Sequence, residues 1–388
     1  MAVPISYNIR NLVLRKGATV MTALGIALTV ATAIFILALL AGLRDAFKTS
    51  GEPNNVLVLR KGSTSELAAG GVDRDALQVI RDLPGIARDA HGDPMVSGED
   101  ILVIVLPRLD GTGSTNVTVR FLTPMGIEMR PGIQILPGGR WFTPGQREIV
   151  VSKSVHERFG QTNIGDSIWI GKGPWQVVGI FDSGGSAHES EIWADINQLA
   201  SDFDRTEYSS VLIGATDPVA ADALKHQVTD DQRLKFNGML ETDYYAEQTK
   251  TGGPIKFVGF MVAFIMAIGS SFAAMNTMYA AVAYRSREIA TLRVLGFSRP
   301  SILSSFVLEA VMLALMGAAI GIVLMLPFNG MTTGTSNPVT FSEAIFSLRM
   351  TTGVITTATI FAVVMGLFGG LAPAWHAARQ DILTALRD

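Results

Sequence analysis

The side chains best suited to binding chemistry lie in one basic stretch, YRSREIATLRVLGFSRPSIL, at residues 284–303. This stretch holds four arginines and one acid, which are Arg285, Arg287, Arg293, Arg299 and Glu288. It lies between two of the longest uncharged runs in the chain. Guanidinium groups bind carboxylates and phosphates. Two partners are therefore open: anionic lipid beside a membrane span, or a groove on another protein.

Sequence patterns that indicate catalysis are absent from the chain. No G-x-x-x-x-G-K-[ST], H-E-x-x-H or G-x-S-x-G occurs in the sequence. The segment HESE, residues 188–191, combines a histidine with two acids, but its spacing matches no standard metal site, and we expect a solvated loop. The chain has no cysteine, which excludes disulfides and thiolate metal sites. We therefore expect a non-catalytic protein that holds no metal and no cofactor of its own.

The elements that position the basic stretch are apolar runs. Of 388 residues, 48% are hydrophobic and 17% are charged, which is below the charged fraction of about a quarter in soluble domains. Four runs, 17–43, 257–284, about 302–328 and 350–378, are long enough to span a bilayer, which takes ~20 residues. Glu309 interrupts the third run near its start, where a carboxylate can reach headgroups or a partner. A cleaved signal peptide is the alternative for the first run, which is too long for one.

Basic residues predict the orientation of these spans. The segment before the first run, the 284–303 stretch and the tail are rich in Lys and Arg, whereas the 329–349 connection carries only Arg349 at its end. Because short basic loops stay in the cytoplasm, both termini are predicted to be cytoplasmic. The net charge of -3 implies no bulk attraction to nucleic acid.

The predicted fold is an α-helical membrane protein with four transmembrane helices and a large α+β extracytoplasmic domain inserted between the first and the second. The domain should have two lobes, with a hairpin over 166–182 and a helix over 217–228 that Asp217 caps. The predicted segments are a cytoplasmic amphipathic helix (1–16), transmembrane helix 1 (17–43), the extracytoplasmic domain (44–254), transmembrane helix 2 (255–284), a cytoplasmic coupling helix (285–299), transmembrane helix 3 (300–328), a short external loop (329–349), transmembrane helix 4 (350–376) and a cytoplasmic tail (377–388). An irregular basic flank is the alternative for the first segment.

Within the basic stretch, Ile289, Leu292 and Leu295 can share one helix face, and Gly296 is placed to end the helix. Ser298 can cap the helix that follows. A basic flank that only meets lipid explains the arginines but neither the apolar face nor the break, so we predict a docking helix. Its expected docking residues are Arg285, Arg287, Glu288, Ile289, Leu292, Arg293, Leu295 and Gly296, with Arg285 and Arg287 at the edge, against the partner or lipid.

Small and polar residues inside the runs indicate helix packing. Gly317 and Gly321, and likewise Gly366 and Gly370, form G-x-x-x-G pairs that allow close helix approach. Asn276 can hydrogen-bond across a helix interface, and a residue of a transport pathway is the alternative.

Several motifs carry a resemblance to a known family. YRSREIATLRVLGFSRPSI resembles the segment between the second and third spans of MacB/FtsX-type ABC transporter permeases, and LAPAWHAARQDILTALRD resembles their ending. GGRWFTPGQREIVVSKSVHERFG and IGDSIWIGKGPWQVVGIFDSGGSAHESEIWAD are similar to MacB-like extracytoplasmic domains. The resemblance covers nearly the whole chain and is closest to the permeases whose ATPase is a separate chain.

The resemblance implies a permease subunit in a bacterial inner membrane that transmits ATP-driven conformational change to its extracytoplasmic domain. The implied cargo is hydrophobic, amphipathic, a peptide or a lipoprotein, exported or extracted from the membrane. The implied partners are a separate dimeric ABC ATPase that holds ATP and Mg, and a second permease copy, identical or a close paralogue. The other implied partners are membrane lipid, a periplasmic adaptor and an outer-membrane channel. The alternative is an FtsX-like signalling transducer that controls an envelope hydrolase.

Overall fold

The structure is a computed structural model that describes residues 4–14, 16–67, 71–203, 205–231, 234–249, 253–336 and 343–380. The chain divides into two compact units. One contains Met1–Ala41, Gly253–Met331 and Leu348–Asp388, and the other contains Gly42–Gly252 and Thr332–Ser347. The last eight residues of the predicted cytoplasmic tail, 381–388, lie outside the described residues, as do Arg15 and residues 1–3 of the amphipathic segment.

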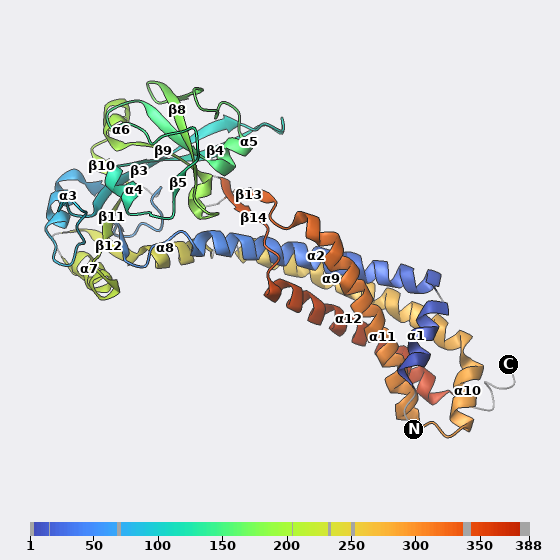
Figure 1. Cartoon of the computed structure of the whole chain (residues 1–388). Helices are drawn as coiled ribbons and strands as arrows, with labels where there is room; N and C mark the ends of the chain where they lie inside the picture. The colour runs from blue at the N-terminus through green and yellow to red at the C-terminus, as the bar shows by residue number, and fades with distance from the viewer. Residues whose placement is uncertain are drawn as a thin grey trace. The chain divides into compact units, whose positions relative to one another are not determined.

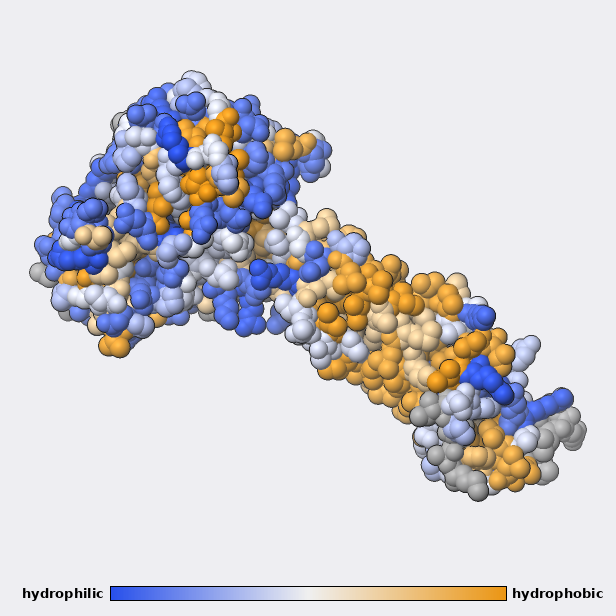
Figure 2. Space-filling view, viewed as in Figure 1, coloured by the Kyte–Doolittle hydropathy of each residue, from blue (hydrophilic) through white to orange (hydrophobic). Residues whose placement is uncertain are grey.

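The first unit is helical (Figure 1). Its helices are α1 (Ile5–Leu14), α2 (Lys16–Lys48), α9 (Gly253–Tyr284), α10 (Ser286–Val294), α11 (Arg299–Met325), the 3₁₀ turn η3 (Leu326–Phe328) and α12 (Thr352–Arg379). Helices α2, α9, α11 and α12 lie side by side, and their surface is largely hydrophobic in Figure 2. All four are long and apolar enough to cross a membrane. α2 alone has 33 residues and thus a length of about 50 Å, well beyond the ~30 Å of a hydrocarbon core.

The second unit is an α+β domain built on one ten-stranded sheet. Its path runs β12-β1-β11-β3-β4-β9-β6-β8-β5, with β7 paired to β8, and two short strands, β2 and β10, pair separately. The strands are β1 (Asn55–Arg60), β2 (Val72–Asp73), β3 (Val96–Pro107), β4 (Ser114–Leu122), β5 (Gln134–Ile135), β6 (Glu148–Ser152), β7 (Ser167–Ile170), β8 (Gly173–Asp182), β9 (Glu191–Asp195), β10 (Glu207–Tyr208), β11 (Ser210–Gly214) and β12 (Phe236–Leu240). The helices are α3 (Arg74–Arg81), α4 (Pro124–Glu128), α5 (Lys153–Arg158), the 3₁₀ turn η1 (Ala187–Ser190), α6 (Ile196–Phe203), α7 (Pro218–Asp230) and α8 (Glu241–Gln248).

Strand β3 joins two lobes of this sheet. Its residues 96–99 pair with β11, whereas residues 100–107 pair with β4. One buried cluster, which includes Val56, Val211 and Leu224, gathers β1, β11 and α7. Another, which includes Val119 and Trp175, gathers β4, β6, β8 and β9. The change of partner within β3 therefore marks the border between the lobes.

Two local predictions of the sequence are confirmed in this domain. β7 and β8 pair antiparallel from Ser167 to Gln176, as the hairpin over 166–182 required. Asp217 caps α7, because its carboxylate accepts the backbone N–H groups of Val219 and Ala220, each at 2.9 Å. These segments carry strong local signals, which explains why the prediction succeeded.

The connection between α11 and α12 is more ordered than the short external loop expected over 329–349. It contains β13 (Thr332–Ser336) and β14 (Glu343–Ser347), which pair antiparallel and belong to the α+β unit. Ile345 is 2% exposed in the same buried cluster as Trp175. Strand β14 is therefore part of the domain core, a role that the polar, glycine-containing sequence of this connection did not indicate.

Candidate functional site

The candidate docking segment is the helix α10 with the turn that follows it. The helix ends in a Schellman motif: the N–H of Gly296 donates to the carbonyl of Arg293 at 3.2 Å, and that of Phe297 to the carbonyl of Leu292 at 3.1 Å. Gly296 has φ of +95°, a left-handed conformation that suits glycine. Ser298 stands at the N-cap of α11, although its side chain makes no capping hydrogen bond. The sequence thus located both the end of one helix and the start of the next.

The apolar residues of α10 do not share one exposed face. Ile289 is 1% exposed and packs in a cluster with α1, α9 and α11, whereas Leu295 is 65% exposed and Leu292 is half-buried. The reason is geometric, because two steps of three residues in a helix turn the side chain by about 120°. The exposed apolar groups of the segment are Val294 and Leu295.

The charged residues of the segment also differ in their exposure to solvent. Arg287 and Glu288 are exposed and Arg293 is half-buried. Arg285, expected at the edge of a partner or the lipid surface, points inward and is only 6% exposed. Fewer residues are therefore exposed for docking than the sequence predicted.

Arg285 connects α10 to two other helices. Its Nη1 donates to Glu309 Oε2 of α11 at 2.9 Å, and both side chains are 6% exposed. The guanidinium lies over the rings of Tyr7, at 5.1 Å, and Phe306, at 5.0 Å. The hydroxyl of Tyr7 donates to Glu288 at 2.9 Å, which brings α1 into the same cluster. Burial of Glu309 requires a cation, and Arg285 supplies it, which corrects the surface role predicted for Arg285.

The predicted packing glycines lie at contacts within the first unit. A Cβ on Gly317 would lie 2.7 Å from Cβ of Ile26 in α2, and one on Gly366 would lie 2.6 Å from Cβ of Ala314 in α11. A Cβ on Gly321 would lie 2.8 Å from the carbonyl oxygen of Ala27, and one on Gly370 would overlap Cβ of Ala310. Since real Cβ atoms do not approach this closely, only glycine permits these helix distances.

Asn276 does not take part in this packing. Its side chain is exposed on α9, whereas Ala274 and Met278, two residues away on either side, are buried. Two residues turn a helix by about 200°, which places Asn276 on the opposite face. A hydrogen bond to another helix within the described part of the chain is therefore not formed.

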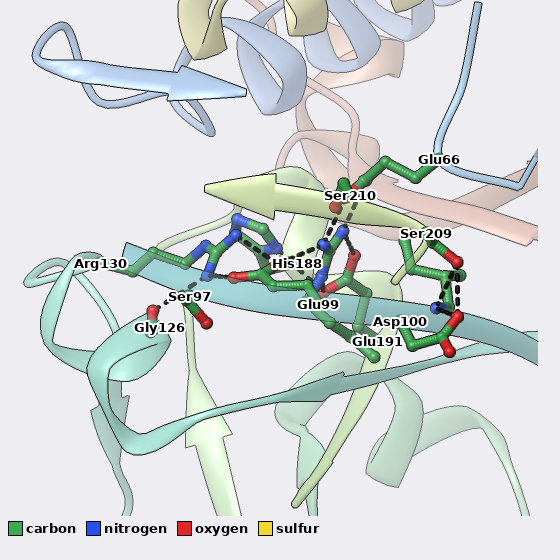
Figure 3. A network of polar contacts seen from close by, with 12 residues as sticks. Glu66, Ser97, Glu99, Asp100, Gly126, Arg130, His188, Glu191, Ser209 and Ser210 are labelled. Carbon is green, nitrogen blue, oxygen red and sulfur yellow. Dashed lines mark hydrogen bonds and ion pairs between the residues drawn. The ribbon is translucent and has the colours of Figure 1, made fainter. Parts of the chain in front are cut away.

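A buried charge network lies where β3 changes its partner (Figure 3). Arg120 of β4 donates to Glu66 at 2.8 Å, to Glu99 at 2.7 Å and to Glu191 at 2.9 Å. Arg130 donates to Glu99 at 2.7 and 2.9 Å. Each guanidinium and carboxylate is almost fully buried, so each depends on its partners for compensation.

The HESE segment belongs to this network and is not the solvated loop that the sequence suggested. His188 is 2% exposed, and its Nδ1 lies 2.9 Å from Oε2 of Glu191. The same carboxylate oxygen accepts the indole N–H of Trp193 at 2.7 Å, and the His188 ring packs edge-on against Trp193 and Tyr245. Across the described residues, no three His, Asp or Glu side chains gather as metal ligands would.

Two carboxylates of the network, Glu191 and Glu241, have pKa values that are shifted in opposite directions. Burial alone would raise the pKa of Glu191, but Arg120 and His188 outweigh it and hold the pKa well below its usual range. Burial raises the pKa of Glu241, because Arg130 lies 3.8 Å away and only partly offsets the loss of water. Glu191 is thus a fixed anion, and Glu241 is the member that takes up a proton more readily than usual.

Sequence reasoning missed this network, although a signal existed. Arg120 stands in the strand VTVRFL, whose six residues are all buried, and Glu99 stands in the similarly buried start of β3. A charge inside a continuous β-branched and apolar strand indicates a buried partner. What this arrangement can do chemically is hold the two lobes together through buried ion pairs.

Four helices suited to span a membrane, joined to a large α+β domain, define a multi-span membrane protein with a folded domain outside its helices. A model described as MacB-like periplasmic core domain matches residues 19–231, and one described as FtsX-like permease C-terminal matches residues 260–382. The chain belongs to the MacB/FtsX-like family of ABC transporter permeases.

Individual relatives are distant. The Macrolide export ATP-binding/permease protein MacB of Hahella chejuensis is 28% identical over 235 residues, which cover 58% of this chain and 35% of that protein. The uncharacterized ABC transporter permease YknZ of Bacillus subtilis is 24% identical over 402 residues, covering 99% of this chain and 98% of that one. MacB of Pasteurella multocida is 22% identical over 391 residues, covering 96% of this chain and 58% of that protein. The chain thus spans well under two thirds of the length of these MacB proteins.

Two solved structures are similar in part. The extracellular domain of YknZ from Gram-positive bacteria aligns with a TM-score of 0.35 at 19% identity, covering 48% of this chain and 100% of that domain. The periplasmic region of MacB from Actinobacillus actinomycetemcomitans aligns with a TM-score of 0.39 at 12% identity, covering 53% of this chain and 96% of that region.

Proposed function

We propose that this chain is the membrane subunit of an ABC transporter complex in a bacterial inner membrane. ATP hydrolysis on a separate, dimeric ATPase chain drives α10, and the resulting movement of the helices changes the conformation of the extracytoplasmic domain. This conformational change exports a hydrophobic, amphipathic, peptide or lipoprotein cargo or extracts it from the membrane. The α+β domain is inserted between the first two spans, and both termini face the cytoplasm.

The observation that carries this proposal is the construction of the docking segment. Its apolar groups Val294 and Leu295 are each 65% exposed beside basic residues. Water makes such an arrangement unfavourable unless a partner covers it. At the same time Arg285 fixes the base of the segment to α1 and α11, so a force applied to α10 reaches two further helices. A lipid anchor would not need that rigid attachment.

The exposed side chain of Asn276 supports a second copy of the chain in the complex. An amide that faces outward from the middle of an apolar helix lacks hydrogen-bond partners in lipid. Two copies related by a twofold axis can pair such amides with each other. A dimer of permeases also matches a dimeric ATPase.

The test is co-purification from the native membrane. The full chain, tagged and extracted in mild detergent, should retain an ABC ATPase, and Leu295→Asp should reduce the amount retained at least tenfold. Val219→Asp is the matched control, because Val219 is 81% exposed and belongs to the α+β unit, whereas α10 belongs to the helical unit. Equal ATPase recovery with Leu295→Asp and the unchanged chain would contradict docking through α10. Recovery of an envelope hydrolase in the place of cargo or adaptor would favour the signalling alternative.

A further inference from the structure

The hairpin β13–β14 is bound to the α+β domain by side chains on both of its faces. The backbone N–H of Ile345 donates to Ser190 Oγ at 2.7 Å, and the Ile345 side chain lies in the domain core. The residues Glu343–Phe346 also form a wall of a cavity of about 80 Å³, whose other walls include Arg120 and Glu191 of the charge network. The hairpin is thus built into the domain next to its buried charges.

A single carboxylate holds the hairpin against two separate elements. Glu343 is 2% exposed in its side chain and accepts from Arg158, at the end of α5, at 2.6 Å. It also accepts from Arg108, which follows the last residue of β3. The two arginines are 19% and 25% exposed, so water only partly screens their repulsion when the carboxylate is removed. We call Glu343, Arg108 and Arg158 the hairpin clamp.

The opposite strand of the hairpin is shaped to fit this carboxylate. A Cβ on Gly334 would overlap Oε1 of Glu343 and would lie 2.7 Å from its Cδ and 2.8 Å from its Cγ. Any residue larger than glycine would therefore displace the whole side chain and separate it from Arg158. Substitution of Gly334, which carries no charge, should therefore disrupt the hairpin clamp.

The ladder of the hairpin continues to the ends of the neighbouring helices. Leu348 donates to the carbonyl of Met331 at 2.9 Å, and Gly330 donates to the carbonyl of Leu348 at 2.9 Å. Met350 donates to the side chain of Asn329 at 2.9 Å, directly before α12 begins at Thr352. The chain that adjoins the hairpin on both sides is therefore hydrogen-bonded up to the residues next to α11 and α12.

We propose that the hairpin clamp is a latch that passes movement of α11 and α12 to the lobe carrying β4 and α5, with Glu343 as its positioning residue. This inference rests on the proposed ATP-driven function. A hairpin that is paired up to the helix ends and clamped at its far end moves with both. Without the clamp, the helices can move while the lobe stays in place.

The local part of the latch is tested by hydrogen exchange on the full chain in lipid nanodiscs. Glu343→Gln should raise the exchange rate of the peptide over 343–348 by about tenfold or more, because the clamp opens. Glu157→Gln, which neutralises an exposed carboxylate on α5, should leave it unchanged. Gly334→Ala should reproduce the effect without a charge change, whereas Gly132→Ala, where a Cβ meets open space, should not. Equal exchange in Glu343→Gln and the unchanged chain would overturn the clamp.

The transmission is tested with the ATPase that co-purifies with the chain. In the unchanged complex, trapping with ATP and vanadate should alter exchange over α5, and Glu343→Gln should abolish that change. The rate of ATP hydrolysis and the amount of bound ATPase should persist, which a general loss of folding would not allow. An α5 response to trapping that survives Glu343→Gln would overturn the latch. An unchanged chain that retains no ATPase would instead contradict the proposed function, so the two failures are distinguishable.

Discussion

Replacing Arg285 with Gln should loosen the contact between α1 and α11, although the residue lies in a segment expected to face outward. The side chain is 6% exposed and bonds to Glu309, which is itself buried. Arg287, two residues further on, is exposed on the same helix. Gln at each position removes one positive charge, so Arg287→Gln is the matched control.

The size of the effect follows from the burial of the pair. Removal of one partner from a buried ion pair costs about 3–5 kcal/mol, because the other charge stays uncompensated. The rings of Tyr7 and Phe306 lose cation–π contacts as well, each of about 0.5–1 kcal/mol. Glu288 is 58% exposed and contributes little. We take the lower end of this range, about 3 kcal/mol, which is equivalent to about a hundredfold in an opening equilibrium.

The assay uses the absence of native cysteine. Ser305 is 7% exposed and donates to Asn8 of α1 at 2.7 Å, so Ser305→Cys places a nearly isosteric thiol beneath α1. Its labelling by N-ethylmaleimide in detergent reports how often α1 separates from α11. Arg285→Gln should raise the labelling rate about a hundredfold, and Arg287→Gln should change it less than threefold.

A double variant provides the decisive comparison. Arg285→Gln with Glu309→Gln removes both charges, and two neutral amides can hydrogen-bond to each other. The labelling rate of the double variant should therefore fall back toward that of the unchanged chain. If Arg285→Gln and Arg287→Gln label at the same rate, or if the double variant is no slower than Arg285→Gln, the ion pair does not hold the junction.

Three further predictions concern the domain and the helices. Arg120→Met leaves three buried carboxylates without their common cation, and the apparent melting temperature in detergent should fall by more than about 5 °C; an unchanged value would contradict the network. A hydrogen bond from Arg140 lowers the pKa of Glu148 to about 2, below an unfolded value near 4.5, so its stabilisation is complete above pH 4.5 and is lost as pH falls toward 2. Thermal unfolding between these pH values should therefore depend less on pH in Glu148→Gln, and identical slopes would refute this. Gly366→Val should cost about 1–3 kcal/mol and lower the folded yield, whereas Gly269→Val, where a Cβ meets nothing, should not; equal yields would refute the packing role.

The helical unit was largely predictable, because its signals are local and one-dimensional. Long runs without charge predicted the four apolar helices, and Gly296 predicted where α10 ends. The surroundings of Asn276 and Arg285 within that unit were not predictable, for different reasons. The face on which Asn276 lies depends on which neighbours cover α9, and the sequence of one helix does not contain that information. The burial of Arg285 depends on Glu309, which is 24 residues away in sequence.

The sequence predicted that the domain is α+β and located several of its helices and strands. It did not predict which strands pair with one another. β3 bonds to β4 next to it in the chain and also to β11, which begins at Ser210. Such non-local pairing leaves no local periodic signal. The same holds for Glu343, whose partners Arg108 and Arg158 are 235 and 185 residues away. The buried ion pairs were therefore not predicted from the sequence, although a charged residue within an apolar strand indicated a buried partner.

Docking of a cytoplasmic ATPase on α10 requires that this helix face the cytoplasm. A single cysteine at Leu295, which is 65% exposed, can be labelled with a membrane-impermeant maleimide in oriented vesicles. We predict labelling in inside-out vesicles and none in right-side-out vesicles, with protection when the ATPase is bound. Labelling of Leu295→Cys in right-side-out vesicles would place α10 away from any cytoplasmic ATPase and contradict the proposed mechanism.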